Sequence, residues 1–232
     1  MPMTEKEFRT FNENMARCFG PDQYHRTKVW LIRMAEAVKR KKIIRALKSI
    51  RRRDGFLLDV GCGACDLLKS LPFPDKVGLD YSMHLLNLSR REQNELNLVQ
   101  GNAENLPFRE DRFSCIMLTD VLEHVLHPER VLEEIHRLCR KAGLFILNVP
   151  NDRLINRCKS FLQYVRLEKH FVTEYHCRYP ASGNLKMSWH IHEFTFKDVK
   201  QLLEKRWNII KFHSIPNALM PFQFLFFLSP KK

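Results

Sequence analysis

The chain has 232 residues, of which 44% are hydrophobic and 28% charged, a composition typical of a globular protein that buries a core without disulfide support. No apolar run approaches the ~20 residues that a membrane-spanning helix needs. The first residues are too polar for a signal peptide, so a cytoplasmic location is expected. The seven cysteines are scattered and odd in number, which is typical of a reducing compartment.

The net charge of +13 is unevenly distributed along the chain. Residues 1–53 carry 15 Lys and Arg against 5 Asp and Glu, and residues 151–232 carry 14 against 6, whereas residues 54–150 carry 10 against 15. The two basic flanks could contact nucleic acid, an anionic membrane face or an anionic substrate. A solvated helix surface without a partner explains the same charges equally well.

Hydrophobic periodicity predicts the first elements. Residues 26–53 predict a helix, because apolar side chains recur every three to five residues without Gly or Pro. Short buried strands are then predicted at 56–60, 77–80, 96–99, 114–118 and 143–149, with helices opening at residue 66 and spanning 83–94 and 128–139. This alternation predicts a parallel sheet covered by helices on both faces. Right-handed crossovers then give a doubly wound arrangement.

The last third of the chain has a different pattern. Residues 150–192 show no clean period, and residues 196–204 predict a helix. Residues 208–212 and 222–228 predict two strands joined without a helix, which is typical of an antiparallel pair at a sheet edge. One domain is expected. Its segments are a basic helical segment (1–53), a cofactor-binding core (54–150), an insertion over the acceptor (151–192), and a C-terminal helix with edge strands (193–232).

Glycines and polar residues follow the predicted strands, where doubly wound sheets bind their ligands. Gly61 and Gly63 come after the first strand and let the backbone turn tightly and approach a ligand. Asp80 ends the second strand, where a carboxylate can accept the two hydroxyls of a ribose. Asn102 and Ala103 follow the third strand, where an amide can read an adenine edge. Together these positions predict a cofactor that contains adenosine.

The charge of the first loop separates two such cofactors. A dinucleotide site uses G-x-G-x-x-G against a pyrophosphate, but here Asp66 holds the third glycine position and Asp59 precedes Gly61. Carboxylates repel a diphosphate and suit the cationic S-adenosylmethionine, which is therefore favoured. Cys62 and Cys65 form a C-x-x-C in this loop; because no second pair has ligand spacing, no metal site is expected, and Cys62 is expected to pack.

Four segments in order resemble the signatures of the class I S-adenosylmethionine-dependent methyltransferases, in the branch that includes ubiquinone and menaquinone biosynthesis enzymes. They are residues 58–63, 78–82, 101–108 and 121–125. The resemblance is strong over residues 54–150 and loose over residues 190–228. It implies a Rossmann-like, doubly wound, mostly parallel seven-stranded α/β sheet with an antiparallel edge hairpin, S-adenosylmethionine as cofactor, and methyltransferase activity.

The resemblance also implies roles for single residues. Asp59 and the two loop glycines would hold the methionine part, Asp80 would bind the ribose, and Asp120 would help to close the pocket. The full set of implied cofactor residues is Asp59, Gly61, Cys62, Gly63, Asp80, Tyr81, Asn102, Ala103, Thr119 and Asp120. The chain departs from the family at Asn102, where Asp is usual, although an amide can still accept and donate there. Asp80 could instead only cap the helix that follows it.

A general base is expected if the acceptor is a hydroxyl, and histidine suits neutral pH. His190 and His192 are the candidate bases, and the sequence does not distinguish them. In the alternative interpretation one histidine packs while Thr195 caps the following helix. Glu123 and His124 could act directly, or they could only pack or cap a helix start.

The insertion is expected to cover the acceptor together with the N-terminal helix. Its aromatic side chains indicate an aromatic, quinone-like or lipid acceptor, methylated on oxygen. They are Phe161, Tyr164, Phe171, Tyr175, Tyr179 and Trp189. The alternatives are an RNA methyltransferase, which basic and aromatic residues also suit, and a non-catalytic cofactor-binding subunit. Against RNA, residues 119–122 differ from the Asn-Pro-Pro-Tyr type of base-amino methyltransferases, and no appended RNA-binding module is recognisable.

Overall fold

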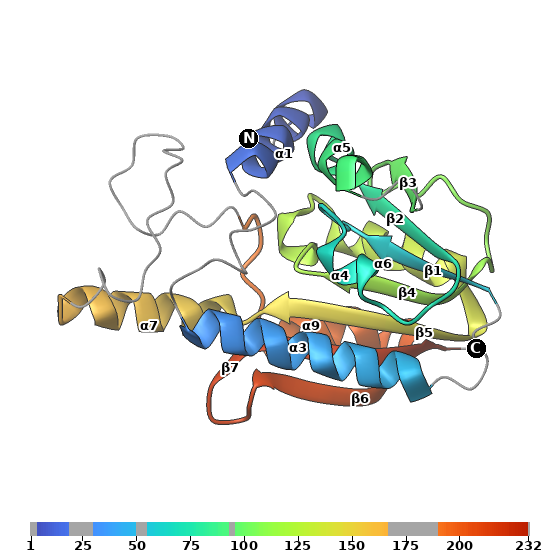
Figure 1. The fold of residues 1–232 in the computed structure, drawn as a ribbon. Coiled ribbons are helices and arrows are strands. Elements are labelled where there is room, and N and C mark those ends of the chain that lie inside the picture. The colour runs from blue at the N-terminus through green and yellow to red at the C-terminus, as the bar shows by residue number, and fades with distance from the viewer. Residues whose placement is uncertain (1–3, 19–29, 50–54, 93–95, 167–189, 232) are drawn as a thin grey trace.

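Strands from both halves of the chain form one sheet in the order β3-β2-β1-β4-β5-β7-β6 (Figure 1). The computed structural model describes residues 4–18, 30–49, 55–92, 96–166 and 190–231. The strands are β1 (Phe56–Val60), β2 (Lys76–Asp80), β3 (Asn97–Gln100), β4 (Phe113–Thr119), β5 (Cys139–Pro150), β6 (Trp207–Pro216) and β7 (Pro221–Pro230). The first five are parallel neighbours, and β7 pairs antiparallel with both β5 and β6. The predicted fold class is confirmed, including the seven strands and the antiparallel edge hairpin.

Helices cover both faces of this sheet (Figure 1). The helices of the described residues are α1 (Glu5–Cys18), which packs on α5, α3 (Trp30–Ser49), α4 (Asp66–Lys69), α5 (Met83–Glu92), the 3-10 helix η1 (Leu122–His124), α6 (Pro128–Leu138), α7 (Asp152–Tyr164) and α9 (Phe196–Glu204). On β4, Ile116 and Leu118 pack with α6 and α9, whereas Cys115 and Met117 pack with α3 and α4. Because β4 is buried on both faces, its sequence is a continuous apolar run rather than an alternating one.

Helix α7 corrects the prediction for residues 150–192, where no clean period was found. Leu154, Cys158 and Phe161 lie along one side of this helix, and its C-terminal part is open to solvent, with Phe161 64% exposed and Tyr164 87% exposed. The helix predicted over residues 26–53 is confirmed from Trp30 to Ser49, and its two ends lie outside the described residues.

The start of α9 confirms the predicted cap at Thr195. Its hydroxyl accepts from the Asp198 N–H at 3.3 Å, and the Asp198 carboxylate accepts from the Thr195 N–H at 2.8 Å. This reciprocal pair satisfies two N–H groups that a helix start leaves unbonded. The next side chain, Phe196, packs on Phe212 and Phe226 of the edge hairpin, so the cap also fixes where α9 meets the sheet.

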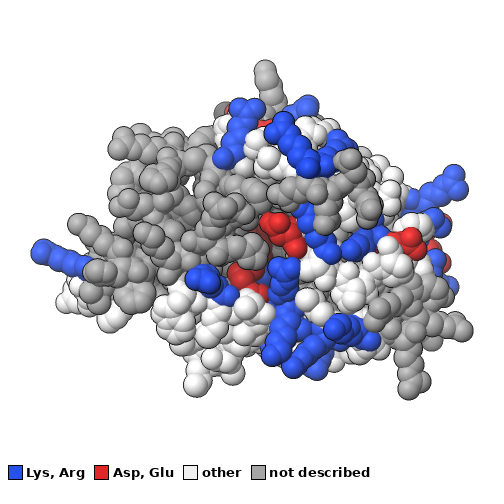
Figure 2. Space-filling model, in the orientation of Figure 1, with Lys and Arg blue, Asp and Glu red and all other residues white. Residues whose placement is uncertain are grey.

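Part of the basic charge of the N-terminal flank lies on α3. In Figure 2, Lys and Arg side chains gather over this helix, beside a smaller acidic area. The exposed cations of α3 are Arg33, Lys41, Arg45 and Lys48. Within the described part of the chain, none of the helices combines the length and the apolar character needed to cross a bilayer.

Candidate cofactor and acceptor site

The candidate site lies at the carboxyl ends of the parallel strands. The strand order reverses between β1 and β4, which is the point where open α/β sheets leave a crevice for a ligand. The carboxyl ends of β1, β2, β4 and β5 and the segments that follow them therefore lie at this edge, and all of the predicted cofactor residues lie at these strand ends, on these segments or on the segment after β3.

The loop after β1 needs glycine at two positions. Gly61 has a φ of +74°, and a Cβ atom there would lie 2.2 Å from Cγ2 of Val121. Gly63 has a φ of +54°, and a Cβ atom there would meet nothing within 4 Å. The backbone of this loop therefore faces open space, as expected where a ligand approaches it closely. Cys62 instead packs on β2, because its sulfur lies 2.8 Å from the position that a Cβ of Gly78 would take.

Asp59 is a buried acid without a matching donor at this end of the sheet. It is 2% exposed, and its Oδ1 atom has no hydrogen-bond partner among the described residues. Burial raises the pKa of Asp59 well above its usual value, and Cys65 and Asp80 raise it further. A buried acceptor of this kind is satisfied only when a donor or cation reaches it. The ammonium group of an amino-acid ligand fits that requirement.

Asp80 braces the loop and begins the next helix at the same time. One oxygen accepts from the Gly63 N–H at 2.8 Å, and the other accepts from the Ser82 N–H at 2.8 Å. Burial raises the pKa of Asp80, while the hydrogen bonds from Ser82 and Gly63 oppose that rise. Each carboxylate oxygen offers a second lone pair, so the helix-capping contact does not prevent Asp80 from binding ribose hydroxyls.

Helix α1 packs beside the end of β2, which the sequence alone did not indicate. Phe8 packs edge-on against Tyr81 at 5.7 Å, and the Ser82 hydroxyl donates to Glu13 at 3.2 Å. A cavity of about 210 Å³ is lined by Arg9, Tyr81, Gln100 and Gly101. This cavity lies at the ends of β2 and β3, where the adenosine part was expected.

The loop after β3 is ordered by its own side chains. The side-chain oxygen of Asn102 accepts from the Glu104 N–H at 2.9 Å, and Ala103 is buried. The carboxylate of Glu104 accepts from the N–H groups of Leu126 and His127 at 2.8 and 3.0 Å. Asn102 thus shapes the turn beside the cavity, and the loop is tied to the segment between η1 and α6.

Five polar side chains form a closed ring beside the site, here called the Lys39 ring: Glu36, Lys39, Asp120, Asn148 and Gln223. The ammonium of Lys39 donates to Asp120 at 2.5 Å and to Glu36 at 2.9 Å. The amide of Asn148 donates to Asp120 at 2.7 Å and to Gln223 at 3.4 Å, and Gln223 donates to Glu36 at 3.0 Å. The ring holds Asp120, whose backbone has a φ of +56°, against α3 at the end of β4.

Lys39 remains charged in this ring. Burial by itself lowers the pKa of Lys39, but Asp120 and Glu36 outweigh that effect and the pKa is raised overall. The sequence did not single out Lys39, because it begins the basic run of residues 39–42, which resembles a solvated surface. Only the three-dimensional position of the strand ends distinguishes it from its neighbours. Thr119, the last residue of β4, is half-buried directly before this ring.

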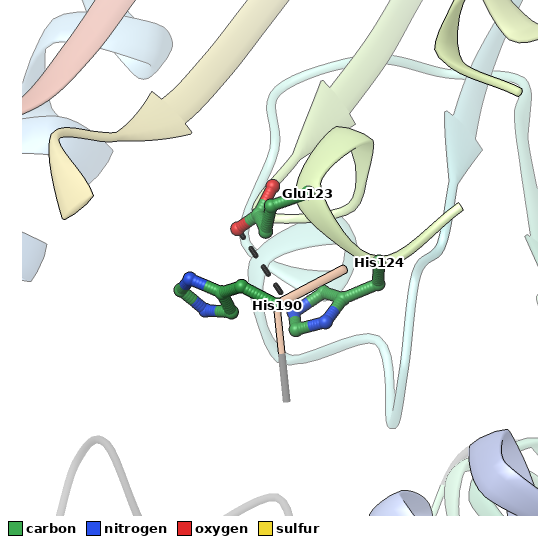
Figure 3. Close-up of side chains that lie close together, drawn as sticks. All are labelled: Glu123, His124 and His190. Carbon is green, nitrogen blue, oxygen red and sulfur yellow. Dashed lines mark ion pairs between the residues drawn. The ribbon is translucent and has the colours of Figure 1, made fainter. Parts of the chain in front are cut away.

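Acidic and imidazole side chains also meet near η1, in a group here called the acceptor cluster: Glu123, His124, Asp152 and His190. Figure 3 shows three of them, Glu123, His124 and His190. His190 Nδ1 lies 2.7 Å from Asp152 Oδ1, and the rings of His124 and His190 meet edge-on at 4.9 Å. His124 Nε2 lies 3.9 Å from Glu123 Oε1. Burial raises the pKa of Glu123 well above its usual value, and Asp120 and Asp152 add to that effect.

The structure separates the two candidate histidine bases by their surroundings. The carbonyl of Glu123 accepts from the N–H groups of Ile191 and His192, at 2.8 and 3.1 Å, and this anchors the segment beside η1. His192 Nε2 lies 3.0 Å from the Val125 carbonyl, and its ring stacks on Phe194. His190, on the other side of the anchor, joins the acceptor cluster. His192 therefore has the contacts of a packed histidine.

Part of the predicted acceptor cover lies outside the described residues. Phe171, Tyr175, Tyr179 and Trp189 belong to that part. The described aromatic side chains of the insertion, Phe161 and Tyr164, project from α7 into solvent.

Comparison with known proteins agrees with this geometry. The family model described as a methyltransferase domain matches residues 58–147. The demethylmenaquinone methyltransferase of Lactobacillus johnsonii is 31% identical over 130 residues, which cover 50% of this chain and 52% of that protein. The enzyme of the same name from Oceanobacillus iheyensis is 34% identical over 120 residues, covering 47% and 50%. The chain thus spans about half the length of these curated relatives.

Solved structures match over more of the chain. A protein of Pyrococcus horikoshii superposes with a TM-score of 0.66 at 18% identity, covering 94% of this chain and 98% of that one. An S-adenosylmethionine-dependent methyltransferase from Clostridium acetobutylicum superposes with a TM-score of 0.62 at 14% identity, covering 90% and 95%. At such identities the likeness establishes the fold.

Proposed function

Because residues 58–147 form a class I S-adenosylmethionine-dependent methyltransferase domain, we propose that this chain moves a methyl group from that cofactor to an oxygen of a small aromatic, quinone-like or lipid acceptor. The observation that carries the proposal is the buried Asp59, whose Oδ1 atom has no hydrogen-bond partner among the described residues, beside a glycine loop that faces open space. A cationic amino acid is the ligand that matches both features.

The residues on the carboxyl ends of the strands would hold the cofactor. Asp59 would accept from its ammonium group, the backbone at Gly61 and Gly63 would lie against its methionine part, and Asp80 would accept from its ribose hydroxyls. The cavity that Tyr81 and Gly101 help to line would take the adenosine part. When bound, the cofactor supplies a methyl group on a positively charged sulfur.

His190 is the histidine that would act on the acceptor. A carboxylate can only accept a hydrogen bond, so the 2.7 Å contact with Asp152 places the imidazole proton on Nδ1. The lone pair is then on Nε2, where His190 can accept the proton of an acceptor hydroxyl. The protein otherwise works by holding two reactants in one orientation, an effect that can contribute ~7–11 kcal/mol.

The acceptor class rests on the curated relatives. Several of them, including those of Lactobacillus johnsonii and Oceanobacillus iheyensis, are named demethylmenaquinone methyltransferases, and a quinone-like acceptor is the class that this name suggests. The exposed aromatic side chains of α7 do not bear on this choice, because Phe161 and Tyr164 lie toward the opposite end of the helix from Asp152.

The first test is calorimetric titration of S-adenosylmethionine and S-adenosylhomocysteine into the wild type, Asp80→Ala and Asp75→Ala. We expect micromolar binding by the wild type and at least a tenfold loss in Asp80→Ala, because each charge-assisted hydrogen bond contributes about 1.5–3 kcal/mol. Asp75 is an exposed carboxylate just before β2, so Asp75→Ala is the matched control and should bind normally. A folded wild type that binds neither ligand would contradict the proposal.

An acceptor screen of phenols, quinone precursors and lipids then tests catalysis. Transfer of radiolabelled methyl to one of these classes is the expected result. Tight cofactor binding without transfer to any acceptor would favour a non-catalytic subunit instead. Transfer to RNA alone would replace the small-molecule acceptor with a nucleic acid.

A further inference from the structure

We propose that Cys62 and Cys65, the C-x-x-C pair of the loop after β1, are a site of reversible oxidation to a disulfide that weakens cofactor binding. Formation of the disulfide does not depend on the proposed function. Its effect on the cofactor does, because that effect rests on S-adenosylmethionine binding at the same loop.

The backbone brings the two cysteines to a separation that a disulfide can span. The Cys65 N–H donates to the Cys62 carbonyl at 2.8 Å, which closes a β-turn between β1 and α4. The ends of such a turn lie less than about 7 Å apart, and disulfides join Cα atoms about 4.4–6.8 Å apart. A bond between the two sulfurs therefore requires only a local adjustment of this turn.

The two side chains also lie together. The sulfurs of Cys62 and Cys65 are 3.8 and 3.9 Å from the same atom, the carbonyl oxygen of Gly63. The two thiols are hydrogen-bonded to one another as well, and both are free. Packing against β2 accounts for the position of Cys62, but it does not require a second thiol in contact with it. Two free thiols in contact across a turn are the arrangement from which a disulfide forms.

The contact between the thiols prepares the pair to react, because the thiolate is the reactive form of cysteine. The hydrogen bond from Cys62 lowers the pKa of Cys65, and Lys69 adds to that effect, although burial opposes it. The same hydrogen bond raises the pKa of Cys62. Cys65 is fully buried, whereas Cys62 is half-buried. Once the pair has lost one proton, transfer of the other to Cys65 places the negative charge on the more exposed sulfur.

Hydrogen peroxide is an oxidant small enough to reach that sulfur. The Cys62 thiolate attacks one peroxide oxygen, so that an S–O bond forms, the O–O bond breaks and hydroxide leaves, which gives a sulfenic acid. Cys65 gives its proton to that hydroxide, and its sulfur attacks the sulfur of Cys62. The S–O bond then breaks, and the second hydroxide takes up the proton that the pair first released. Two thiols and one peroxide thus become one disulfide and two waters, and a dithiol reductant reverses the change by thiol–disulfide exchange.

The disulfide would alter the part of the loop that faces the cofactor. Gly63 lies between the two cysteines, and its N–H donates to Asp80 at 2.8 Å. A bond of about 2.05 Å between the sulfurs draws the turn together around Gly63. Cys65 already has a φ of +66°, which side chains other than glycine rarely adopt, so the turn has little freedom to absorb the change. We therefore expect oxidation to weaken cofactor binding and, by reciprocity, bound cofactor to oppose oxidation.

Peptide mapping of the full chain tests the modification. Trypsin cleaves after Arg53 and Lys69, so both cysteines fall in one peptide, residues 54–69. After treatment with hydrogen peroxide and alkylation, we expect this peptide to be unalkylated and lighter by two hydrogen atoms, and to take up two alkyl groups once dithiothreitol has been added. S-adenosylmethionine should slow the reaction. A folded, peroxide-treated chain whose peptide stays fully alkylated would overturn the proposal.

Calorimetry of S-adenosylmethionine with the reduced and the oxidised chain tests the effect. We expect oxidation to weaken binding roughly tenfold or more, and dithiothreitol to restore it. Cys62→Ser and Cys65→Ser each lack the pair, so each should bind equally before and after peroxide. Cys158→Ser, at a half-buried cysteine on α7, is the matched control and should respond to peroxide as the wild type does. Circular dichroism checks that each variant is folded.

The outcomes separate this proposal from the proposed function. An unchanged affinity in a fully oxidised chain would overturn the effect assigned to the disulfide, and so would a peroxide response that persists in both Cys62→Ser and Cys65→Ser. A reduced chain that binds S-adenosylmethionine but forms no disulfide refutes this site alone. A chain that forms the disulfide but binds no cofactor when reduced refutes the proposed function and leaves the modification site in place.

Discussion

Asp59 illustrates how a single residue can lower stability in return for binding. Its carboxyl is buried with one oxygen unpartnered, and burial raises its pKa well above the usual value. In the unfolded chain the same group ionises near pH 4. Between these two pKa values the folded state binds more protons than the unfolded state, so rising pH removes stability. A ligand that brings a cation to this carboxyl would supply a partner for the Oδ1 atom and offset the cost of burying it.

Asp59→Asn should therefore have opposite effects on stability and on binding. We expect the variant to unfold at higher urea than the wild type at pH 7, with a difference that shrinks toward pH 4, since Asn carries no charge to bury. S-adenosylmethionine should bind the variant at least tenfold more weakly, because the contact of its ammonium with a carboxylate is lost. Urea titrations at pH 4, 5.5 and 7, with calorimetry of the cofactor, measure both effects. A stability difference that does not change with pH would contradict this account of Asp59.

Single residues also show where sequence reasoning stops. The positions of Asp59, Gly61 and Asp80 follow from their places after short apolar runs, because strand ends converge in any doubly wound sheet. His190 and His192 have the same local signal, and only the contacts with Asp152 and Val125 separate them. Such contacts join residues that are far apart in the chain, so the periodicity of apolar residues in the sequence cannot predict them.

At the scale of elements, α3 acts as part of the site and not only as its cover. Its Lys39 ties Asp120 at the end of β4 to the strands β5 and β7 through Asn148 and Gln223. Residues of α3, β5 and β7 and the residue after β4 thus meet in the Lys39 ring.

Lys39→Met should loosen that junction. We expect a loss of about 3 kcal/mol, the low end of the range for breaking a buried ion pair, because Asp120 and Glu36 are partly exposed. Lys41→Met, on the exposed face of the same helix, should stay within about 0.5 kcal/mol of the wild type. Urea unfolding of both variants measures the difference. Equal stabilities of Lys39→Met and Lys41→Met would mean that the ring contributes nothing.

The helices and strands could be predicted where their buried residues form a run or a periodic pattern of apolar side chains. The strand predicted at 56–60 and the helix predicted at 196–204 have those bounds in the structure. Strand β5 begins at Cys139 rather than at Gly143, because Arg140 and Lys141 are polar and give no strand signal. Helix α7 was missed although Leu154, Cys158 and Phe161 recur at steps of four and three residues within it, because residues 150–192 as a whole show no single period.

At the scale of the whole molecule, charge is segregated between the helix α3 and the cofactor-binding core. The exposed cations Arg33, Lys41, Arg45 and Lys48 gather on one face (Figure 2). The acids of the core instead lie at the strand ends. An anionic partner would therefore meet α3 without crossing the acidic part of the site.

Binding to polyanions should consequently depend steeply on salt. We expect vesicles containing phosphatidylserine to bind the protein at 50 mM salt and to release it by about 300 mM, because screening shortens the reach of exposed charges. Lys41→Glu with Arg45→Glu should weaken binding, while S-adenosylmethionine affinity stays unchanged. Co-sedimentation measures binding, and a parallel titration with RNA separates the two kinds of partner. Binding that is insensitive to both salt and the double substitution would show that α3 is not the contact surface.

The Lys39 ring also has a consequence for how the protein is made. Glu36 and Gln223 are 187 positions apart in the chain, yet their side chains are hydrogen-bonded to one another in the Lys39 ring, which also holds Asp120. A ribosome releases Glu36 and Lys39 early and Gln223 last among the five. A nascent chain that already contains the glycine loop and Asp80 therefore still lacks Gln223, one member of the Lys39 ring. The cofactor pocket is therefore completed late in synthesis, when the hairpin of β6 and β7 has been made and can join the sheet.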